Sequence, residues 1–287
     1  MRPKNLKTRI FLDGGDIGET KEIKNRLGFL DGQTTNPTLV SRNPRVKDRL
    51  EKGLKFNRDE MLGFYRDLVR EISQVIPQGS ISIEVYADRS TSAEEMLRQG
   101  KEMFSWIPNA HIKFPSSGEG LKAAERAIKE GLRVNMTLCF SQEEAAAVYA
   151  ATQGAKKGNV FVSPFVGRLD DWGENGMDLI ANIIKMYHSG DGHVEVLTAS
   201  VRNLNHLLYA LHLGSDIMTA PFKILKEWEE KGFPVPGSDY LYDSKGLRSI
   251  PFREIDLTRK WETYDIHHEL TDKGMELFSR DWNALIQ

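Results

Sequence analysis

Residues 110–154 read AHIKFPSSGEGLKAAERAIKEGLRVNMTLCFSQEEAAAVYAATQG, and they contain one unit twice. Each copy begins with a short apolar run, continues through a Ser with a Glu three positions later, takes up helical apolar spacing and ends at a Gly. The run predicts a buried strand, the Ser and Glu predict the start of a helix, and the Gly favours the left-handed residue that ends it. The stretch therefore predicts a strand and a helix, followed by a second strand and helix.

Strand-like runs of this kind occur eight times along the chain. They are residues 8–13, 31–36, 80–86, 110–114, 133–140, 159–166, 194–200 and 215–220. The predicted helix starts are Asp16 with Glu19, Ser92 with Glu95, Ser116 with Glu119 and Ser141 with Glu144, and the predicted helix-ending glycines are Gly28, Gly131, Gly154 and Gly214. Alternation of strands and helices builds a parallel sheet, and eight strands close into a (β/α)8 TIM barrel. An open doubly wound sheet is the structural alternative.

Two segments depart from this unit. Residues 41–60 are polar and charge-rich, and we expect an irregular helical insertion there, followed by a long helix near residues 59–76. Residues 1–237 are expected to form the barrel, and residues 238–287 an extension that packs on it within the same domain. An apolar stripe at helical spacing predicts a last helix with Met275, Phe278, Trp282 and Leu285 on one face. A plain structural role is favoured for it over part of a lid.

The composition of the chain indicates which classes of binding partner to expect. The chain has 287 residues, and its 39 Lys and Arg nearly balance its 41 Asp and Glu, so the overall charge favours no nucleic acid or membrane partner. Cys139 is the only cysteine, and we expect it to be an inert core residue in a protein from a reducing compartment. His267 and His268 are expected at the surface without a metal. No segment predicts a signal peptide or a membrane span, so a cytoplasmic protein with a small-molecule or protein ligand is expected.

One lysine lies where a strand should be buried. Lys113 stands between apolar residues, with Ile112 before it and Phe114 after it. A buried ammonium group needs a partner, a shifted pKa or a chemical use. Glu84, near the end of the preceding strand, is one candidate partner, and a structural ion pair between the two would explain the lysine without any catalysis.

Polar residues mark the ends of most of the predicted strands. In a barrel, functional side chains gather at the C-terminal ends of the strands. The candidates for this rim are Asp13, Asn36, Glu84, Lys113, Asn135, Thr137, Ser163, Arg168, Ser200 and Arg202. Taken alone, Asp13 and Asn36 are better explained as turn or helix caps, the two serines as small strand-end residues, and Arg168 as a partner of Asp170 or Asp171. The concentration of all these groups on one rim favours a shared function.

The chemistry of this rim points to carbonyl substrates. A lysine in an apolar barrel mouth is expected to have a lowered pKa, and the neutral amine attacks carbonyl groups to form a Schiff base. Glu84 and Asp13 are the carboxylates available to move protons. Arg168 and Arg202, with nearby serines, match an anionic group such as phosphate. The residues therefore predict an aldolase-type enzyme that acts on a phosphorylated sugar.

At these positions the sequence resembles the transaldolase family. The matching stretches are FLDGGDIGE (11–19), LDGQTTNPTLV (30–40), IEVYAD (83–88), IKFPSSGEGLKA (112–123), VNMTLCFSQEEA (134–145), VSPFVGRLDDW (162–172) and TASVRN (198–203). TTNPT (34–38) and SPFVGR (163–168) are highly specific signals, and ELTDKGMELFSRDW (269–282) resembles the closing helix of longer members. The resemblance implies a (β/α)8 barrel with the Schiff-base lysine on the fourth strand, where Lys113 lies.

The resemblance also implies a role for each residue. Lys113 is similar to the Schiff-base lysine, and Asp13 to the acid or base that acts on a substrate hydroxyl during carbon–carbon cleavage. Glu84 and Thr137 resemble a pair that holds a catalytic water. The implied substrate-binding positions are Asn36, Asn135, Ser163 and Phe165, and the implied phosphate-binding positions are Arg168, Ser200 and Arg202.

The implied reaction is the transfer of a three-carbon dihydroxyacetone unit from a ketose phosphate, fructose 6-phosphate or sedoheptulose 7-phosphate, to an aldose phosphate in the pentose phosphate pathway. It needs no cofactor and no metal. The fructose-6-phosphate aldolase branch usually has Gln at the Glu84 position and Tyr at the Phe165 position, so both residues favour a transaldolase. The alternatives are an aldolase that releases dihydroxyacetone, a transaldolase for another anionic sugar such as a sulfonate, and a non-catalytic binding barrel. A homo-oligomer is expected.

Overall fold

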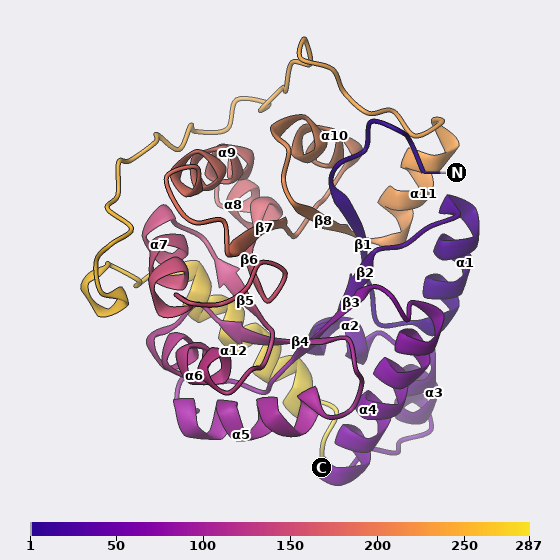
Figure 1. Cartoon of the computed structure of the whole chain (residues 1–287). Coiled ribbons are helices and arrows are strands. Elements are labelled where there is room, and N and C mark those ends of the chain that lie inside the picture. The colour runs from indigo at the N-terminus through magenta and orange to yellow at the C-terminus, as the bar shows by residue number, and fades with distance from the viewer. Residues whose placement is uncertain (1) are drawn as a thin grey trace.

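The computed structural model describes residues 2–287, and its eight strands close into a parallel barrel (Figure 1). The strands are β1 (Arg9–Asp13), β2 (Gly32–Thr34), β3 (Ser80–Glu84), β4 (Ala110–Pro115), β5 (Val134–Cys139), β6 (Val160–Pro164), β7 (Val194–Thr198) and β8 (Ile217–Ala220). The barrel closes because β1 pairs with both β2 and β8, so that Phe11 lies opposite Gly32 on one side and Thr219 on the other. The expected (β/α)8 barrel is confirmed, and the open sheet is wrong.

Helices alternate with the strands, and most of them surround the barrel and cover the outer faces of its strands (Figure 1). They are α1 (Ile17–Leu27), α2 (Pro37–Ser41), α3 (Pro44–Glu51), α4 (Arg58–Val75), α5 (Ala93–Phe104), α6 (Gly118–Lys129), α7 (Gln142–Ala151), α8 (Val166–Asp171), α9 (Gly176–Tyr187), α10 (Leu204–Leu213), α11 (Phe222–Glu230), the 3-10 helix η1 (Trp261–Thr263) and α12 (Glu269–Asn283). Every residue of β4, β5, β6, β7 and β8 is buried. Side chains therefore pack on both faces of these strands, as parallel barrels require.

The predicted helix starts are right in place but only partly right in detail. Ser141 and Glu144 form the expected reciprocal capping box on α7. The helix after β4 is capped by Ser117, because the hydroxyl of Ser116 instead donates to the Thr137 carbonyl between β4 and β5. The predicted cap at Ser116 is therefore wrong by one residue. Gly28 and its three predicted counterparts all have positive φ, as expected for helix-ending glycines.

The polar insertion between β2 and β3 is helical. It holds the short helix α3, which buries only Val46, and it ends at Asn57, which forms a capping box with Glu60 at the start of α4. The expected helix over residues 59–76 is α4, shifted by one residue. The insertion therefore packs on the barrel through few side chains and is otherwise a solvent-facing segment, as its charge-rich composition predicts.

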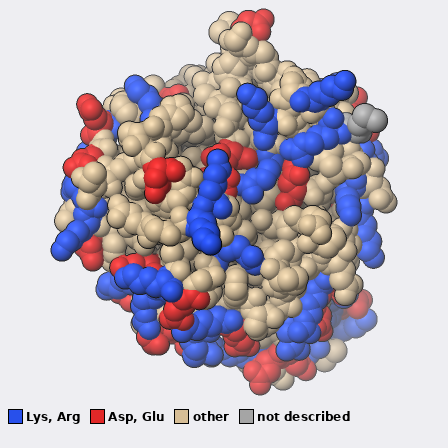
Figure 2. Space-filling view, viewed as in Figure 1, with Lys and Arg blue, Asp and Glu red and all other residues tan. Residues whose placement is uncertain are grey.

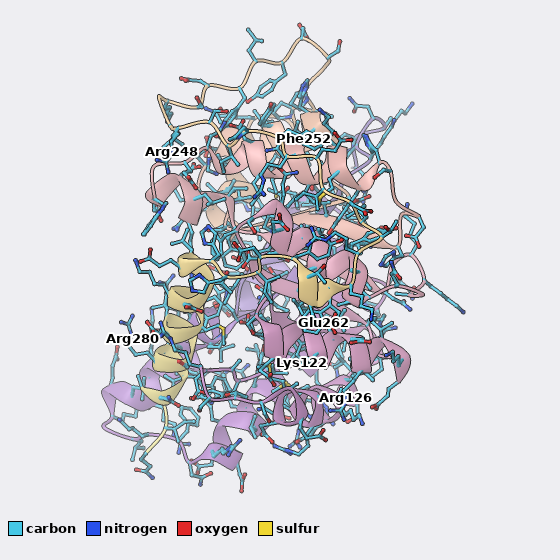
Figure 3. All side chains as sticks on the ribbon, turned by 90° about the vertical axis from the view of Figure 1, so that its left-hand side faces the viewer. Lys122, Arg126, Arg248, Phe252, Glu262 and Arg280 are labelled. Atoms are coloured by element: carbon cyan, nitrogen blue, oxygen red, sulfur yellow. The ribbon has the colours of Figure 1, made fainter. Side chains whose placement is uncertain are left out.

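The segment after α11 runs around the outside of the barrel past α10, α9 and α7 before α12 crosses one end (Figure 1). Side-chain hydrogen bonds attach it on the way: the amide of Asn182 donates to the Ile250 carbonyl, and Gln142 exchanges two bonds with the Arg253 backbone. Figure 3 shows α12 lying across that end, with Arg280 on its outer side. The predicted apolar stripe is confirmed for Met275, Phe278 and Trp282, which are buried on α12, whereas Leu285 is buried just beyond the end of that helix.

Charged side chains are distributed without a large area of one sign on the face drawn in Figure 2, where Lys and Arg lie among Asp, Glu and neutral residues. No helix in residues 2–287 is both long enough and apolar enough to cross a membrane.

Candidate active site

A cavity of about 320 Å³ opens at the C-terminal ends of the strands. The residues predicted for the rim that line it are Asp13, Asn36, Lys113, Ser163, Arg168, Ser200 and Arg202, and Phe165, a position implied by the family resemblance, lines it as well. The strand register explains part of this convergence, because Glu84 pairs with Lys113 and Lys113 pairs with Asn135 on neighbouring parallel strands. Residues opposite one another in a parallel ladder project to the same face, so these three side chains all enter the barrel.

Lys113 and Glu84 form a buried ion pair. Lys113 Nζ lies 2.7 Å from Glu84 Oε2, and the two side chains are only 4% and 6% exposed. Nζ also donates a hydrogen bond of 3.0 Å to the Thr35 carbonyl at the end of β2. Burial raises the pKa of Glu84, and the charges of Lys113 and Arg168 oppose that rise. The ion pair considered from the sequence is therefore present. Lys113 lines this cavity, whereas Glu84 does not line it and instead borders a second cavity.

Asp13 is the last residue of β1, and its side chain lines the cavity. Its carboxylate accepts a hydrogen bond of 2.7 Å from Thr34 Oγ1, which in turn lies 2.7 Å from Thr219 Oγ1. Burial raises the pKa of Asp13, and the charge of Lys113 opposes the rise most strongly. Asp13 is not a helix cap, because Asp16 caps α1, so that alternative is wrong. Asn36 is a helix cap, and it also lines the cavity. Its side chain caps α2 by accepting a hydrogen bond of 2.9 Å from the Leu39 N–H.

Asn135 and Ser163 form a buried polar chain behind the cavity. Ser163 Oγ donates to Asn135 Oδ1 at 2.6 Å, and Asn135 Nδ2 donates to Ser82 Oγ at 3.0 Å. Asn135 does not itself line the cavity. Thr137, two residues further along β5, has a buried hydroxyl with no hydrogen-bond partner within residues 2–287. A buried polar group without a partner is costly, so this hydroxyl is suited to a partner that the protein does not supply.

Arg168, another residue of the cavity wall, lies between two aromatic rings. Its guanidinium carbon is 5.4 Å from the centre of the Phe165 ring and 5.1 Å from that of Phe278. Burial lowers its pKa, and the charge of Glu84 is the main opposing influence. The expected alternative, a pair with Asp170 or Asp171, is wrong: those carboxylates bind His206 and Arg202 instead.

Ser200 and Arg202 come from the loop between β7 and α10, which has an unusual backbone. Ser200 has a φ of 59°, a conformation that non-glycine residues rarely adopt. The Ala199 and Ser200 carbonyls accept hydrogen bonds from the Val166 and Gly167 N–H groups at 3.0 Å each. Arg202 packs so closely over Gly167 that a Cβ on that glycine would lie 2.4 Å from Arg202 Cγ. The loops after β6 and β7 are therefore held together by backbone contacts.

A tyrosine that is not among the predicted site residues contacts both residues that bind Lys113. The Tyr65 hydroxyl, carried by α4, accepts from the Glu84 N–H at 3.0 Å and lies 2.5 Å from Thr35 Oγ1, which donates to the Ser82 carbonyl. The same Thr35 supplies the carbonyl that binds Lys113 Nζ. In the sequence Tyr65 is one member of an apolar helical stripe, so no local signal distinguishes it.

Helix α12 contributes to the cavity as well as to the core. Phe278 and Leu277 line the cavity, and a Cβ on Gly274 would lie 2.6 Å from a Leu138 methyl and 2.8 Å from Arg168 Nη1. The Thr271 hydroxyl of the same helix donates to the Leu138 carbonyl at 3.0 Å. The expected plain structural role is thus too narrow, because α12 forms one wall of the cavity.

His268 is only partly the surface residue expected. Its side chain caps α12, with Nδ1 accepting from the Leu270 N–H at 3.1 Å, and its ring stacks on Phe140. His267 is exposed, as predicted. Cys139 is a buried free cysteine, and burial holds the pKa of its thiol well above the usual value. Within residues 2–287, no three His, Cys, Asp or Glu side chains are grouped as a metal site would require.

A second cavity, of about 560 Å³, lies between α4, α5 and α12. It is larger than the first, but Glu84 is the only residue of the predicted rim that lines it. Trp106 and Trp282 form part of its wall. The candidate chemistry therefore belongs to the smaller cavity, where the lysine, the second carboxylate and both arginines meet.

Comparison with known proteins agrees with this arrangement. The profile of the family described as Transaldolase/Fructose-6-phosphate aldolase matches residues 10–287. The chain belongs to this family. A protein named probable transaldolase from Dehalococcoides mccartyi is 34% identical over 277 residues, covering 96% of this chain and 99% of the relative. A protein of the same name from Brucella ovis is 35% identical over 274 residues, covering 96% of each chain.

The protein is accordingly an enzyme of the transaldolase type. Among solved structures, a 3-hexulose-6-phosphate synthase from Salmonella typhimurium aligns with a TM-score of 0.49 and 12% identity, over 78% of this chain and 97% of that one. That likeness is too weak for any functional argument.

Proposed function

We propose that this transaldolase-family enzyme transfers a three-carbon dihydroxyacetone unit from a ketose phosphate, fructose 6-phosphate or sedoheptulose 7-phosphate, to an aldose phosphate through a Schiff base on Lys113. The observation that carries the proposal is the position of Lys113 Nζ: it is buried at the cavity wall, 2.7 Å from Glu84 Oε2, in a cavity that Asp13, Arg168 and Arg202 also line. A solvated surface amine would offer neither a proton acceptor at contact distance nor a water-poor site for the carbonyl.

The first step forms the covalent intermediate. Lys113 Nζ passes a proton to Glu84 and attacks the C2 carbonyl of the ketose, giving a carbinolamine. The raised pKa of Glu84 makes its carboxylate a stronger base than an exposed glutamate, which suits this transfer. Protonation of the carbinolamine hydroxyl then releases water and leaves an iminium ion. The unpartnered hydroxyl of Thr137 supports a bound water in the same interior, which would relay these protons.

The second step breaks the carbon–carbon bond. Asp13 accepts the proton of the C4 hydroxyl, the C3–C4 electron pair moves into the iminium to form an enamine, and an aldehyde leaves. Burial raises the pKa of Asp13, so its carboxylate is also a stronger base than usual. The enamine then adds to the carbonyl carbon of the acceptor aldehyde while Asp13 returns its proton. Water hydrolyses the new iminium and frees Lys113.

The phosphate group of either sugar is assigned to Arg168, Ser200 and Arg202. Arg168 and Arg202 both line the cavity, and Arg168 has no carboxylate partner within residues 2–287. Two guanidinium groups and a hydroxyl provide the charge-assisted hydrogen bonds that phosphate oxygens accept. Glu84 and Phe165, which resemble the transaldolase branch, favour transfer over simple cleavage to free dihydroxyacetone.

Reductive trapping tests the proposal directly. Borohydride added with fructose 6-phosphate should reduce the iminium to a stable amine, and mass spectrometry should place the adduct on Lys113. Lys113→Ala should lose the adduct, whereas Lys129→Ala, at an exposed lysine paired with Glu125, should keep it. A folded wild-type protein without an adduct would contradict the proposal and favour a binding barrel. Product analysis with and without an acceptor aldehyde then distinguishes transfer from cleavage.

A further inference from the structure

A buried histidine lies directly behind the loop that carries Ser200 and Arg202. His206, in the first turn of α10, is only 2% exposed. Its Nδ1 accepts a hydrogen bond of 3.3 Å from the Arg202 N–H, and its Nε2 lies 2.8 Å from Asp170 Oδ2. Asp170 belongs to α8, which follows β6 and also carries Arg168. The histidine therefore connects the two loops that supply the proposed phosphate ligands.

The hydrogen-bond partners define which ring nitrogen carries the proton. A backbone N–H can only donate, so Nδ1, facing Arg202, must be the acceptor. The ring proton of a neutral imidazole is then on Nε2, where it is donated to the Asp170 carboxylate. The other oxygen of Asp170 accepts from the Gly176 N–H at 3.0 Å, which fixes the carboxylate in turn. Each group in the chain from Gly176 to Arg202 thus has one defined direction of donation.

The loop needs such support because its backbone is strained. Ser200 holds a positive φ without being glycine, a conformation that costs free energy and persists only where the surroundings enforce it. The Val166 and Gly167 N–H groups hold the loop at Ala199 and Ser200, and His206 holds it at Arg202. The neighbouring Asp171 contacts Arg202 from the other end, with its Oδ2 2.9 Å from Nη2. Adjacent carboxylates on α8 therefore fix both the backbone and the side chain of Arg202.

We propose that Asp170 and His206 are positioning residues that set the affinity for the phosphate group of the substrate by fixing the backbone of the Ser200 and Arg202 loop. The proposal rests on the proposed role of Arg168, Ser200 and Arg202 as the phosphate site. Neither residue lines the catalytic cavity, so both act through the loop rather than on the substrate.

Asp170→Asn is the sharpest test because it replaces a single acceptor oxygen with an NH₂ donor. The Asn oxygen can still accept from the Gly176 N–H, while its NH₂ group now donates to Nε2 and forces the ring proton onto Nδ1. Two donors, Nδ1–H and the Arg202 N–H, would then face each other. We expect KM for fructose 6-phosphate and the inhibition constant of inorganic phosphate to rise about tenfold, since a buried donor loses its partner. The kcat/KM for unphosphorylated fructose should change less than about twofold.

Two substitutions of His206 should lower the phosphate affinity to different degrees. His206→Asn places an amide oxygen near the position of Nδ1 and can still accept from the Arg202 N–H, so the loss of phosphate affinity should be about threefold or less. His206→Leu keeps the volume but removes the acceptor, and the loss should match that of Asp170→Asn. A merely structural role predicts instead that both substrates lose activity in parallel with the loss of thermal stability.

Asp178→Asn is the matched control. Asp178 is also an aspartate that accepts a backbone N–H, that of Ile250 at 3.0 Å, but it holds the C-terminal extension and has no bond to the 199–203 loop. It should leave the ratio of kcat/KM for the two sugars unchanged. If Asp170→Asn also leaves that ratio unchanged while borohydride still traps the Lys113 adduct, the inference is wrong and the proposed function stands. A wild-type enzyme without an adduct would instead overturn the proposed function.

Discussion

The two halves of the candidate active site are positioned by different means. Lys113 and Glu84 are carried by β4 and β3, where their pairing in the parallel ladder fixes their relative positions. Arg168 and Arg202 are carried by the segments that follow β6 and β7, and they depend on close backbone contacts at Gly167 and on the strained Ser200. The proposed chemistry therefore rests on hydrogen-bonded strands, whereas the proposed phosphate recognition rests on close contacts between the segments after β6 and β7. Substitutions should therefore separate kcat from phosphate affinity.

Glu84→Gln should have the largest effect. It removes the charge 2.7 Å from Lys113 Nζ, so the ammonium group is left buried without a counter-charge. We expect kcat to fall about 1,000-fold, with KM for fructose 6-phosphate little changed. The free energy of unfolding should fall by about 3 kcal/mol, because breaking a buried ion pair leaves the remaining charge uncompensated. Steady-state kinetics and urea denaturation measure the two effects, and a large rise in KM with unchanged kcat would contradict the division into halves.

The pH dependence of the reaction should report the ionisation of the two carboxylates that the strands carry. Both Asp13 and Glu84 must be ionised to accept protons, and burial raises the pKa of each. Activity is lost as pH falls through these raised values, so the acid limb of kcat/KM should lie above the range of exposed carboxylates, with a tenfold loss per pH unit below it for one group. A profile of log kcat/KM against pH checks this. An acid limb at the ordinary carboxylate pKa would mean that neither group acts as the base.

Gly167→Ala should affect only the proposed phosphate site, whose arginines are carried by the segments after β6 and β7. The added methyl group would lie 2.4 Å from Arg202 Cγ and from the Ser200 carbonyl oxygen, so the two loops must separate. We expect about a tenfold rise in KM for fructose 6-phosphate and little change in borohydride trapping with unphosphorylated dihydroxyacetone. Gly63→Ala is the control, because its added methyl group would have no side chain or other segment within 4 Å, apart from its chain neighbours. Equal loss of trapping in Gly167→Ala would show that the halves are coupled.

Gly274→Ala should have the smallest effect on activity. Its methyl group would contact a Leu138 methyl at 2.6 Å and Arg168 Nη1 at 2.8 Å, both of which are side-chain atoms that can shift. We expect a loss of about 1–3 kcal/mol in stability from overpacking. A rise of about threefold in KM should accompany it, since Arg168 moves with its neighbours. Unchanged KM together with a lower thermal midpoint would show that α12 supports the fold without shaping the phosphate site.

The features that could be predicted from the sequence are those that local patterns determine. The strand runs, the barrel and the polar strand ends followed from local pattern, because the pleat and the parallel register place alternate residues inside. Lys113 and Asp13 were found in this way, and the structure brings them to one cavity. Thr137 was found in this way too, whereas Phe165 entered the predicted set only through the family resemblance.

The remainder depends on contacts between distant segments. Tyr65 is separated from Glu84 by a loop and a strand, and its hydroxyl gives no pattern in the sequence. The link from Asp170 to His206 joins α8 to α10, and the approach of these two helices is known only once the barrel has closed. The helix start at Ser117 was missed by one residue because Ser116 bonds to the neighbouring strand, a choice that capping patterns alone do not reveal.

The close packing of α12 on Arg168 has a consequence for biosynthesis. Every strand of the barrel is translated before Gly274 and Phe278, so a nascent chain can complete its sheet while one wall of the pocket is still inside the ribosome. In that interval Leu138 and Arg168 lack the contacts that Gly274 and Phe278 later supply. The ability to turn over sugar would then appear only after the barrel has formed, as a late event in the maturation of the chain.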